Sequence, residues 1–135
     1  MQVSHRSLEE LIPAQQQAIR LSPRDPTIRL WYFRTGVGHL LNSRFDTAVL
    51  WFEKSRNANP EVSFIRTFLA SAYALIDQTE PAAFELAEAR RLSGDDRYSS
   101  IARLKSIGHW GVPKIRALYE ATYFAGLRKA GMPEE

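Results

Sequence analysis

The chain has 135 residues, of which 44% are hydrophobic and 24% charged, and its formal net charge at pH 7 is +3. This length and composition fit one domain that can bury a core, and they exclude wholesale disorder. The sequence contains no cysteine, which excludes disulfides, thiolate metal sites and cysteine nucleophiles.

The search for targeting signals and runs of charge bears on the cellular location and the possible partners of the protein. The first ten residues lack the apolar core of a signal peptide, and no apolar run approaches the ~20 residues of a membrane span. We therefore predict a cytoplasmic protein with no membrane partner. The densest basic run, over residues 90–116, is interrupted by Asp95 and Asp96 and matches no nucleic-acid motif. No nucleic-acid partner is expected either.

The first predicted helix lies within residues 7–22. Ser7 is a suitable N-cap, and Pro13 must kink or restart the helix. Its end places Ala18 and Pro23 five residues apart, a spacing that recurs at the ends of the next two helix pairs. This spacing indicates the second helix of a repeat whose first helix is missing, so we expect a piece of a longer protein.

The next two predicted helices form a pair. Asp25 and the proline that follows it are a strong start for a helix over residues 26–42. Gly36 and Gly38 lower the intrinsic helix propensity of this segment, so another helix is expected to approach closely at both positions. The partner helix is predicted over residues 45–58, and a proline stops it.

A second pair is predicted over residues 63–94. Its first helix has the cleanest 3.6-residue period in the chain. The apolar stripe comprises Phe64, Ile65, Phe68, Leu69, Ala72, Tyr73, Leu75 and Ile76. After a turn at residues 77–79, Thr79 is the expected N-cap of the next helix, and Gly94 occupies the position of a left-handed C-terminal residue.

Two further helices are predicted within residues 96–131. Asp95 and its neighbour are expected to cap a helix over residues 97–107, followed by a loop at 108–111 and a last helix over 113–130. The apolar set of the last helix is Val112, Ile115, Leu118, Tyr119, Thr122 and Leu127. These helices are expected to cover the apolar flank of the last repeat. No stretch alternates with period two, so we predict an all-α fold of about seven helices in antiparallel pairs.

The two central pairs are related by an interval of 34 residues. Ala70 corresponds to Gly36 and Ala82 to Ala48, so small residues recur where helices must approach closely. The residues predicted to pack the pairs are Tyr32, Gly36, His39, Ala48, Phe52, Pro60, Leu69, Ala70, Tyr73, Ala82, Leu86 and Ala89. An interval of 34 with this alternation of small and large side chains resembles the tetratricopeptide repeat (TPR).

The resemblance implies a single TPR-type α-solenoid over residues 1–135. It comprises a partial repeat at 7–22, repeats at 26–60 and 63–94, and C-terminal capping helices at 96–131. It also implies a groove, formed by the first helix of each repeat, that binds a protein or peptide. The outward-facing groove positions would be Leu30, Phe33, Val37 and Leu40 in one repeat and Phe64, Thr67, Ser71 and Ala74 in the next.

The groove positions favour an apolar partner. Some TPR proteins hold a C-terminal carboxylate with Lys and Asn there, but Phe33 and Val37 occupy these places here. An apolar or helical peptide fits better. Alternatively, Trp31 packs with these two residues against a second copy, which would make the segment a homodimerisation element.

Catalytic motifs are not found in the sequence. There are three histidines, His5, His39 and His109: His39 occupies the packing position that Tyr73 fills in the next repeat, and His109 has no second ligand at metal spacing. There is also no phosphate-binding glycine loop or nucleophile motif. We therefore expect a non-catalytic chain without metal or cofactor.

Three short segments of the sequence are similar to one particular group of TPR proteins. Residues 25–33, 44–49 and 126–134 resemble the C-terminal TPR region of rhizobial-type adenylate/guanylate cyclases and related bacterial signalling proteins. The resemblance implies a cyclase domain upstream, which this segment would control through a partner or by self-association. No cyclase catalytic residue has a counterpart here.

Overall fold

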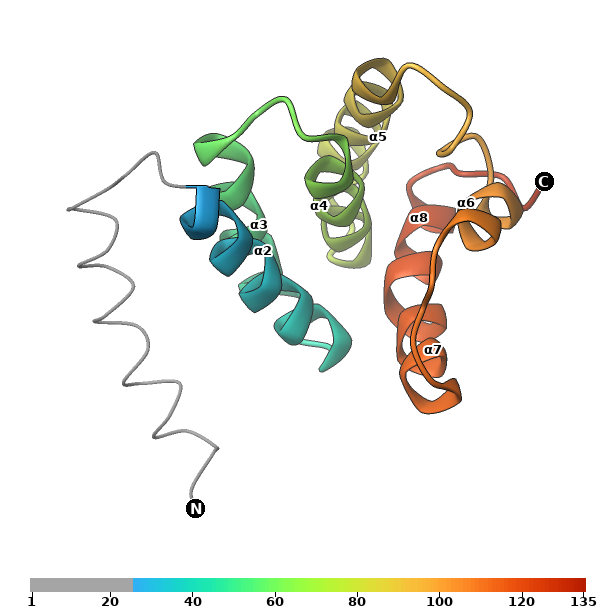
Figure 1. Cartoon of the computed structure of the whole chain (residues 1–135), viewed down its shortest axis with the longest axis horizontal. Helices are drawn as coiled ribbons and strands as arrows, with labels where there is room; N and C mark the ends of the chain where they lie inside the picture. The colour runs from blue at the N-terminus through green and yellow to red at the C-terminus, as the bar shows by residue number, and fades with distance from the viewer. Residues whose placement is uncertain (1–25) are drawn as a thin grey trace.

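The computed structural model describes residues 26–135, and within this range every element is helical (Figure 1). The helices are α2 (Pro26–Leu41), α3 (Phe45–Ala58), α4 (Ser63–Leu75), α5 (Thr79–Ser93), α6 (Ile101–Ile107), α7 (Pro113–Tyr119), the π-helical η1 (Glu120–Phe124) and α8 (Ala125–Lys129). The last three follow without a break, and we call them together the C-terminal helix. The predicted all-α class is confirmed for the described residues, whereas the helix predicted at 7–22 lies outside them.

The helices α2 and α3 form one antiparallel pair, α4 and α5 form the next, and α3 packs against α4 (Figure 1). The two pairs turn in the same way. Ser43 and Asp77, which lie 34 residues apart, both adopt left-handed backbone conformations, with φ of 62° and 64°. Each turn has the same two hydrogen bonds, for example from Arg44 N to His39 O and from Gln78 N to Tyr73 O, both 2.9 Å. The interval found in the sequence is therefore reproduced in the backbone.

Two predicted helix starts need correction. Thr79 is the first residue of α5 rather than its N-cap. The helix predicted from residue 97 begins only at Ile101, because the Ser100 side chain accepts the Arg103 backbone N–H at 3.0 Å and so caps α6. Asp95 accepts the Arg97 backbone N–H at 3.1 Å and holds a turn instead of starting a helix. The left-handed conformation predicted at Gly94 is confirmed, with φ of 69°.

The C-terminal tail completes the start of α6. The backbone N–H groups of Ile101 and Ala102 donate to the carbonyls of Pro133 and Glu134 at 2.8 and 2.9 Å. These two donors have no partner within their own helix, and the tail satisfies them. Met132 is buried beside this contact, so the short helix α6 is held by the end of the chain.

Most residues predicted to pack the helix pairs are buried. They are Tyr32, Gly36, Ala48, Phe52, Leu69, Ala70, Tyr73, Ala82, Leu86 and Ala89. His39 and Pro60 differ. His39 is half-buried and its Nδ1 accepts the Arg44 Nε–H at 2.9 Å, so it stabilises the α2–α3 turn instead of filling the space between helices. Pro60 is exposed, and its carbonyl accepts from Arg66 Nε at 2.9 Å.

The two glycines of α2 have different surroundings. A Cβ on Gly36 would lie 2.5 Å from Cε1 of Phe52, whereas a Cβ on Gly38 would meet no atom within 4 Å. Close helix approach is therefore confirmed at Gly36, and the prediction of close approach at Gly38 is wrong.

Alanine at these two positions should have opposite effects on stability. Gly36→Ala should lower the free energy of unfolding by about 1–3 kcal/mol, because the fully buried ring of Phe52 has no room to move away. Gly38→Ala should raise it by up to about 1 kcal/mol through helix propensity alone. Urea unfolding followed by circular dichroism measures both. Shifts of the same sign would contradict the described approach of Phe52.

Candidate helix groove and neighbouring pocket

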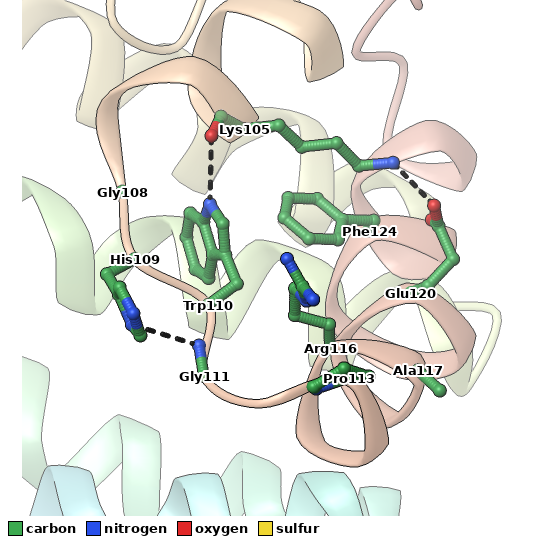
Figure 2. Close-up of a pocket in the computed structure, with 10 residues that line it drawn as sticks. All are labelled: Lys105, Gly108, His109, Trp110, Gly111, Pro113, Arg116, Ala117, Glu120 and Phe124. Atoms are coloured by element: carbon green, nitrogen blue, oxygen red, sulfur yellow. Dashed lines mark hydrogen bonds and ion pairs between the residues drawn. The ribbon is translucent and has the colours of Figure 1, made fainter.

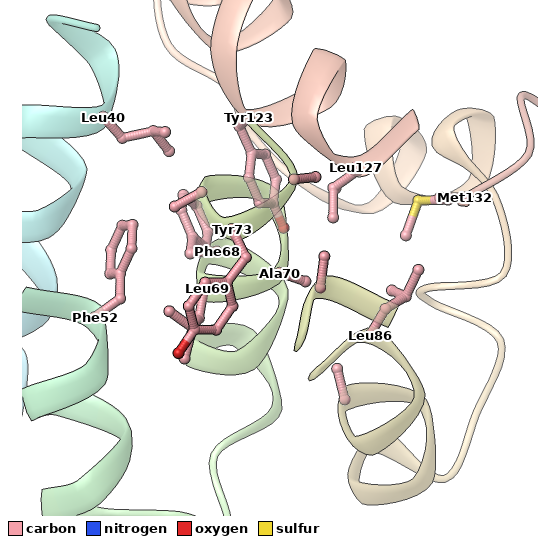
Figure 3. Close-up of a cluster of buried hydrophobic side chains, with 14 of the residues drawn as sticks. Leu40, Phe52, Phe68, Leu69, Ala70, Tyr73, Leu86, Tyr123, Leu127 and Met132 are labelled. Carbon is pink, nitrogen blue, oxygen red and sulfur yellow. The ribbon is translucent and has the colours of Figure 1, made fainter. Parts of the chain in front are cut away.

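The face formed by the first helices of the two pairs, α2 and α4, is where the sequence places a partner groove. In the structure the C-terminal helix lies on this face, in contact with α4 and, through η1, with α2 (Figures 1 and 3). The ring of Phe68 on α4 stacks on the ring of Tyr123, with centroids 3.9 Å apart and planes at 14°. The Tyr123 hydroxyl is hydrogen-bonded to Thr67 Oγ1 at 2.8 Å, and both side chains are buried.

A contact between small residues brings the two backbones together. The Ser71 hydroxyl donates to the backbone carbonyl of Tyr123 at 2.8 Å. A Cβ on Gly126 would lie 2.1 Å from Ser71 Oγ and 2.5 Å from the Ser71 carbonyl oxygen. Further along, Lys129 forms an ion pair with Asp77. Residues 67, 71 and 77 thus meet residues 123, 126 and 129 in the same order, so the C-terminal helix runs in the same direction as α4.

Because of this arrangement, the prediction is wrong for four of the eight groove residues. Leu40, Thr67, Ser71 and Ala74 are buried, so they do not line a free surface. The reason is that the C-terminal helix returns to the face of α4 instead of only covering the end of the last pair.

The other four predicted groove residues are at the edge of the covered region. Phe33 and Val37 are partly buried against the core, and the ring of Phe33 lies 4.9 Å from the rings of Phe64 and Phe68. Leu30 and Phe64 keep 36% and 37% of their surface exposed. An open apolar edge therefore remains beside the covered face.

A pocket of about 590 Å³ lies between α6, the loop at 108–111 and the C-terminal helix (Figure 2). Its lining residues are Lys105, Gly108, His109, Trp110, Gly111, Pro113, Arg116, Ala117, Glu120 and Phe124. The indole of Trp110 donates to the Lys105 carbonyl at 3.3 Å and packs edge-on to Phe124, with centroids 5.0 Å apart. A Cβ on Gly108 would lie 2.7 Å from the indole, so glycine is required there for this placement of Trp110.

Some charged side chains at the pocket form ion pairs and others do not. Glu120 accepts from Lys105 Nζ at 2.5 Å and from Arg128 Nη1 at 2.8 Å. These bonds, that of Arg128 first, lower the pKa of Glu120 below its ordinary value. The Arg116 side chain makes no hydrogen bond or ion pair with residues 26–135, and its guanidinium extends into the pocket in Figure 2. Nδ1 of His109 accepts the Gly111 backbone N–H at 3.2 Å, which leaves Nε2 as the protonated nitrogen of the neutral ring.

Few features of the sequence indicate this pocket. His109 and Trp110 between two glycines are an unusual loop, but nothing marks Arg116 on the following helix. In the described part of the chain, no group of three His, Cys, Asp or Glu residues is placed to hold a metal ion. None of the helices over residues 26–135 has the length and apolar character needed to cross a membrane.

Comparisons with protein-family models, curated proteins and solved structures find no match to this chain. The functional assignment therefore depends on the contacts of the groove and the pocket themselves.

The ion pairs of Glu120 make one contribution to stability pH-dependent. A carboxylate whose pKa is lowered on folding stabilises the folded state above the ordinary pKa of 4.5, and this stabilisation is lost as the pH falls through the lower, folded value. The midpoint of thermal unfolding should therefore be higher in the wild type than in Glu120→Gln at pH 7, and the difference should shrink steadily as the pH falls below 4.5. Glu80→Gln is the control, since exposed Glu80 makes no ion pair with the described residues. A difference that persists at low pH would contradict this origin.

Proposed function

We propose that the chain is a TPR-type scaffold that binds an amphipathic helix of a partner protein on the α2/α4 face. The proposal is supported by the turns repeated at an interval of 34 residues and by the stacking of α3 on α4. The observation that carries it is the C-terminal helix, which already occupies this face.

The contacts of the C-terminal helix define what the face accepts. Tyr119, Tyr123 and Leu127 are spaced four residues apart and lie on one side of a helix, the usual pattern of anchors for a helix in a groove. The ring of Tyr119 lies 6.5 Å from that of Phe68, and Leu127 is fully buried. Gly126 lets the two backbones approach. A partner helix with an aromatic or apolar residue every four positions and one small residue fits the same contacts.

A partner must compete with the chain's own helix. An attached segment has a high effective concentration at its site, so it lowers the apparent affinity of any competitor that binds the same face. The C-terminal helix therefore sets a threshold, and a partner binds when its affinity exceeds that threshold or when the helix is released.

The test uses a variant that releases the helix. Gly126→Leu places a large side chain where even a Cβ would contact Ser71, so the helix should leave the face. A labelled synthetic peptide with the wild-type sequence of residues 112–132 should then bind the variant, and should bind the wild-type chain about tenfold more weakly or worse. Fluorescence anisotropy measures both affinities, and circular dichroism checks that the variant remains helical.

A control peptide that differs from the wild-type peptide at one position tests whether binding is specific. The same peptide with Tyr123→Ala lacks the ring that stacks on Phe68, so it should bind the variant much more weakly. If a folded Gly126→Leu variant binds neither peptide, or binds both equally, the face does not recognise a helix and the proposal is wrong. Sedimentation of the variant distinguishes peptide binding from exchange of the helix between two copies.

We further propose, on the similarity of residues 25–33, 44–49 and 126–134 alone, that this scaffold belongs to a larger signalling protein such as an adenylate cyclase. The reading frame upstream of residue 1 tests this setting directly. A gene without a cyclase domain there would overturn it, while leaving the helix-binding proposal untouched.

A further inference from the structure

The pocket beside Trp110 has the size and composition of a ligand site. Its volume of about 590 Å³ lies within the range of roughly 300–1,000 Å³ that is usual for small-molecule sites. We propose that it binds a small aromatic monocarboxylate. This inference does not depend on the α2/α4 face, because none of the residues that line the pocket lies on α2 or α4 (Figure 2).

The first reason is an uncompensated cation. Two cationic side chains line the pocket, Lys105 and Arg116, and Lys105 pairs with the carboxylate of Glu120, which also pairs with Arg128 outside the lining. Arg116 is left without an anion among residues 26–135. A guanidinium presents parallel N–H groups that match a carboxylate, so Arg116 is the group that would bind one.

The second reason is the aromatic wall. Trp110 is fixed by its hydrogen bond to the Lys105 carbonyl and by its edge-on contacts with Phe124 and Tyr119, with centroids 5.0 and 5.4 Å apart. The indole is therefore rigid and only partly buried, and Phe124 closes the floor behind it. A flat apolar ring can stack on such a surface without reorganising it.

Charge favours a monoanion over a phosphate group. Among the lining residues, the cations Lys105 and Arg116 face one carboxylate, that of Glu120, which leaves one positive charge. A single free guanidinium neutralises one carboxylate but not a phosphate dianion. His109 adds a neutral donor through Nε2, because its Nδ1 already accepts from Gly111.

The experiment uses 2-naphthoate as the probe and the full chain as the protein. Binding is followed by the shift of the Trp110 indole N–H signal in nitrogen–proton NMR spectra, assigned with the variant Trp110→Phe. The neutral analogue 2-naphthamide has the same ring without the charge. We expect saturable binding of the carboxylate and about tenfold or more weaker binding of the amide, as lost charged hydrogen bonds imply.

Variants of the C-terminal helix test whether Arg116 binds the carboxylate of naphthoate. Arg116→Gln should weaken naphthoate binding by about tenfold or more, and Arg116→Lys should restore part of the affinity. Lys114→Gln removes the same charge from the same helix outside the pocket and should change the affinity by less than about twofold. Arg116 is exposed, so the thermal midpoint should remain unchanged.

Three results would overturn the proposal. They are no shift of the Trp110 signal at millimolar naphthoate, equal affinity for the acid and the amide, and unchanged affinity in Arg116→Gln. Each is independent of the peptide experiment on the α2/α4 face, so the two proposals can fail separately.

Discussion

Tyr123→Ala is expected to lower the free energy of unfolding by about 3–5 kcal/mol, the usual loss when a large buried ring is removed. Tyr123 is fully buried, its ring stacks on Phe68, and its hydroxyl bonds to Thr67. The side chain thus joins the C-terminal helix to α4 through both its ring and its hydroxyl. Urea unfolding followed by circular dichroism and by tyrosine and tryptophan fluorescence measures the loss.

Tyr123→Phe separates the ring from the hydroxyl. Thr67 also donates to the Phe64 carbonyl at 2.9 Å, so Thr67 keeps one partner when the phenol is removed. The expected loss is about 1–2 kcal/mol. Phe84→Ala is the control for ring removal, because Phe84 is 59% exposed and its loss should change stability by no more than about 0.5 kcal/mol. Similar losses in Tyr123→Ala and Phe84→Ala would show that the C-terminal helix does not depend on this contact.

The elements with local signals were predictable from the sequence. The helices α2, α3, α4 and α5 begin and end within about two residues of their predicted bounds, because proline, glycine and the 3.6-residue period act within a few residues of chain. The recurrence of small residues predicted a close helix approach at Gly36, where the structure places Phe52.

The placement of the C-terminal helix was not predictable in this way. The hydrogen bond between Thr67 and Tyr123 joins residues 56 positions apart, and no local pattern encodes it. The small residues Ser71 and Gly126 are evident in the sequence, but each one alone is compatible with an exposed helix face. Only their pairing across two helices places the C-terminal helix on the α2/α4 face.

The buried face of the C-terminal helix was also misassigned. The 3.6-residue period selected Val112 and Leu118, which are exposed, and omitted Tyr123 and Phe124, which are buried. Tyr123 and Phe124 lie within the π-helical segment Glu120–Phe124, where the wider turn departs from the 3.6-residue period. A helical period applied across that segment therefore drifts off the packed face.

The pocket was hidden for a different reason. A lone arginine on a helix normally indicates a solvated charge. Arg116 becomes distinctive only because Lys105 and Arg128 use the nearby carboxylate of Glu120 and leave Arg116 unpaired. That distribution of partners depends on α6 lying beside the C-terminal helix, which the sequence does not specify.

Glu85→Gln is the other change with a large expected effect. Glu85 is only 2% exposed, yet it is charged and accepts from Arg56 on α3 at 2.6 Å and from Arg66 on α4 at 2.8 Å. A neutral amide leaves two partly buried guanidinium groups without a counter-charge. Breaking a buried ion network in this way costs about 3–5 kcal/mol, which we expect as the loss in the free energy of unfolding.

The neighbouring Glu88 provides the control for this prediction. It lies on the same helix and pairs with Arg91 at 2.9 Å, but this pair is open to solvent. Glu88→Gln should therefore change the free energy of unfolding far less than Glu85→Gln does. Equal effects of the two changes would mean that Glu85 is as well solvated as Glu88. A much larger effect at Glu85 would mean that one carboxylate on α5 holds both α3 and α4. Those contacts would then keep the two helix pairs stacked, and with them the face on which the C-terminal helix lies.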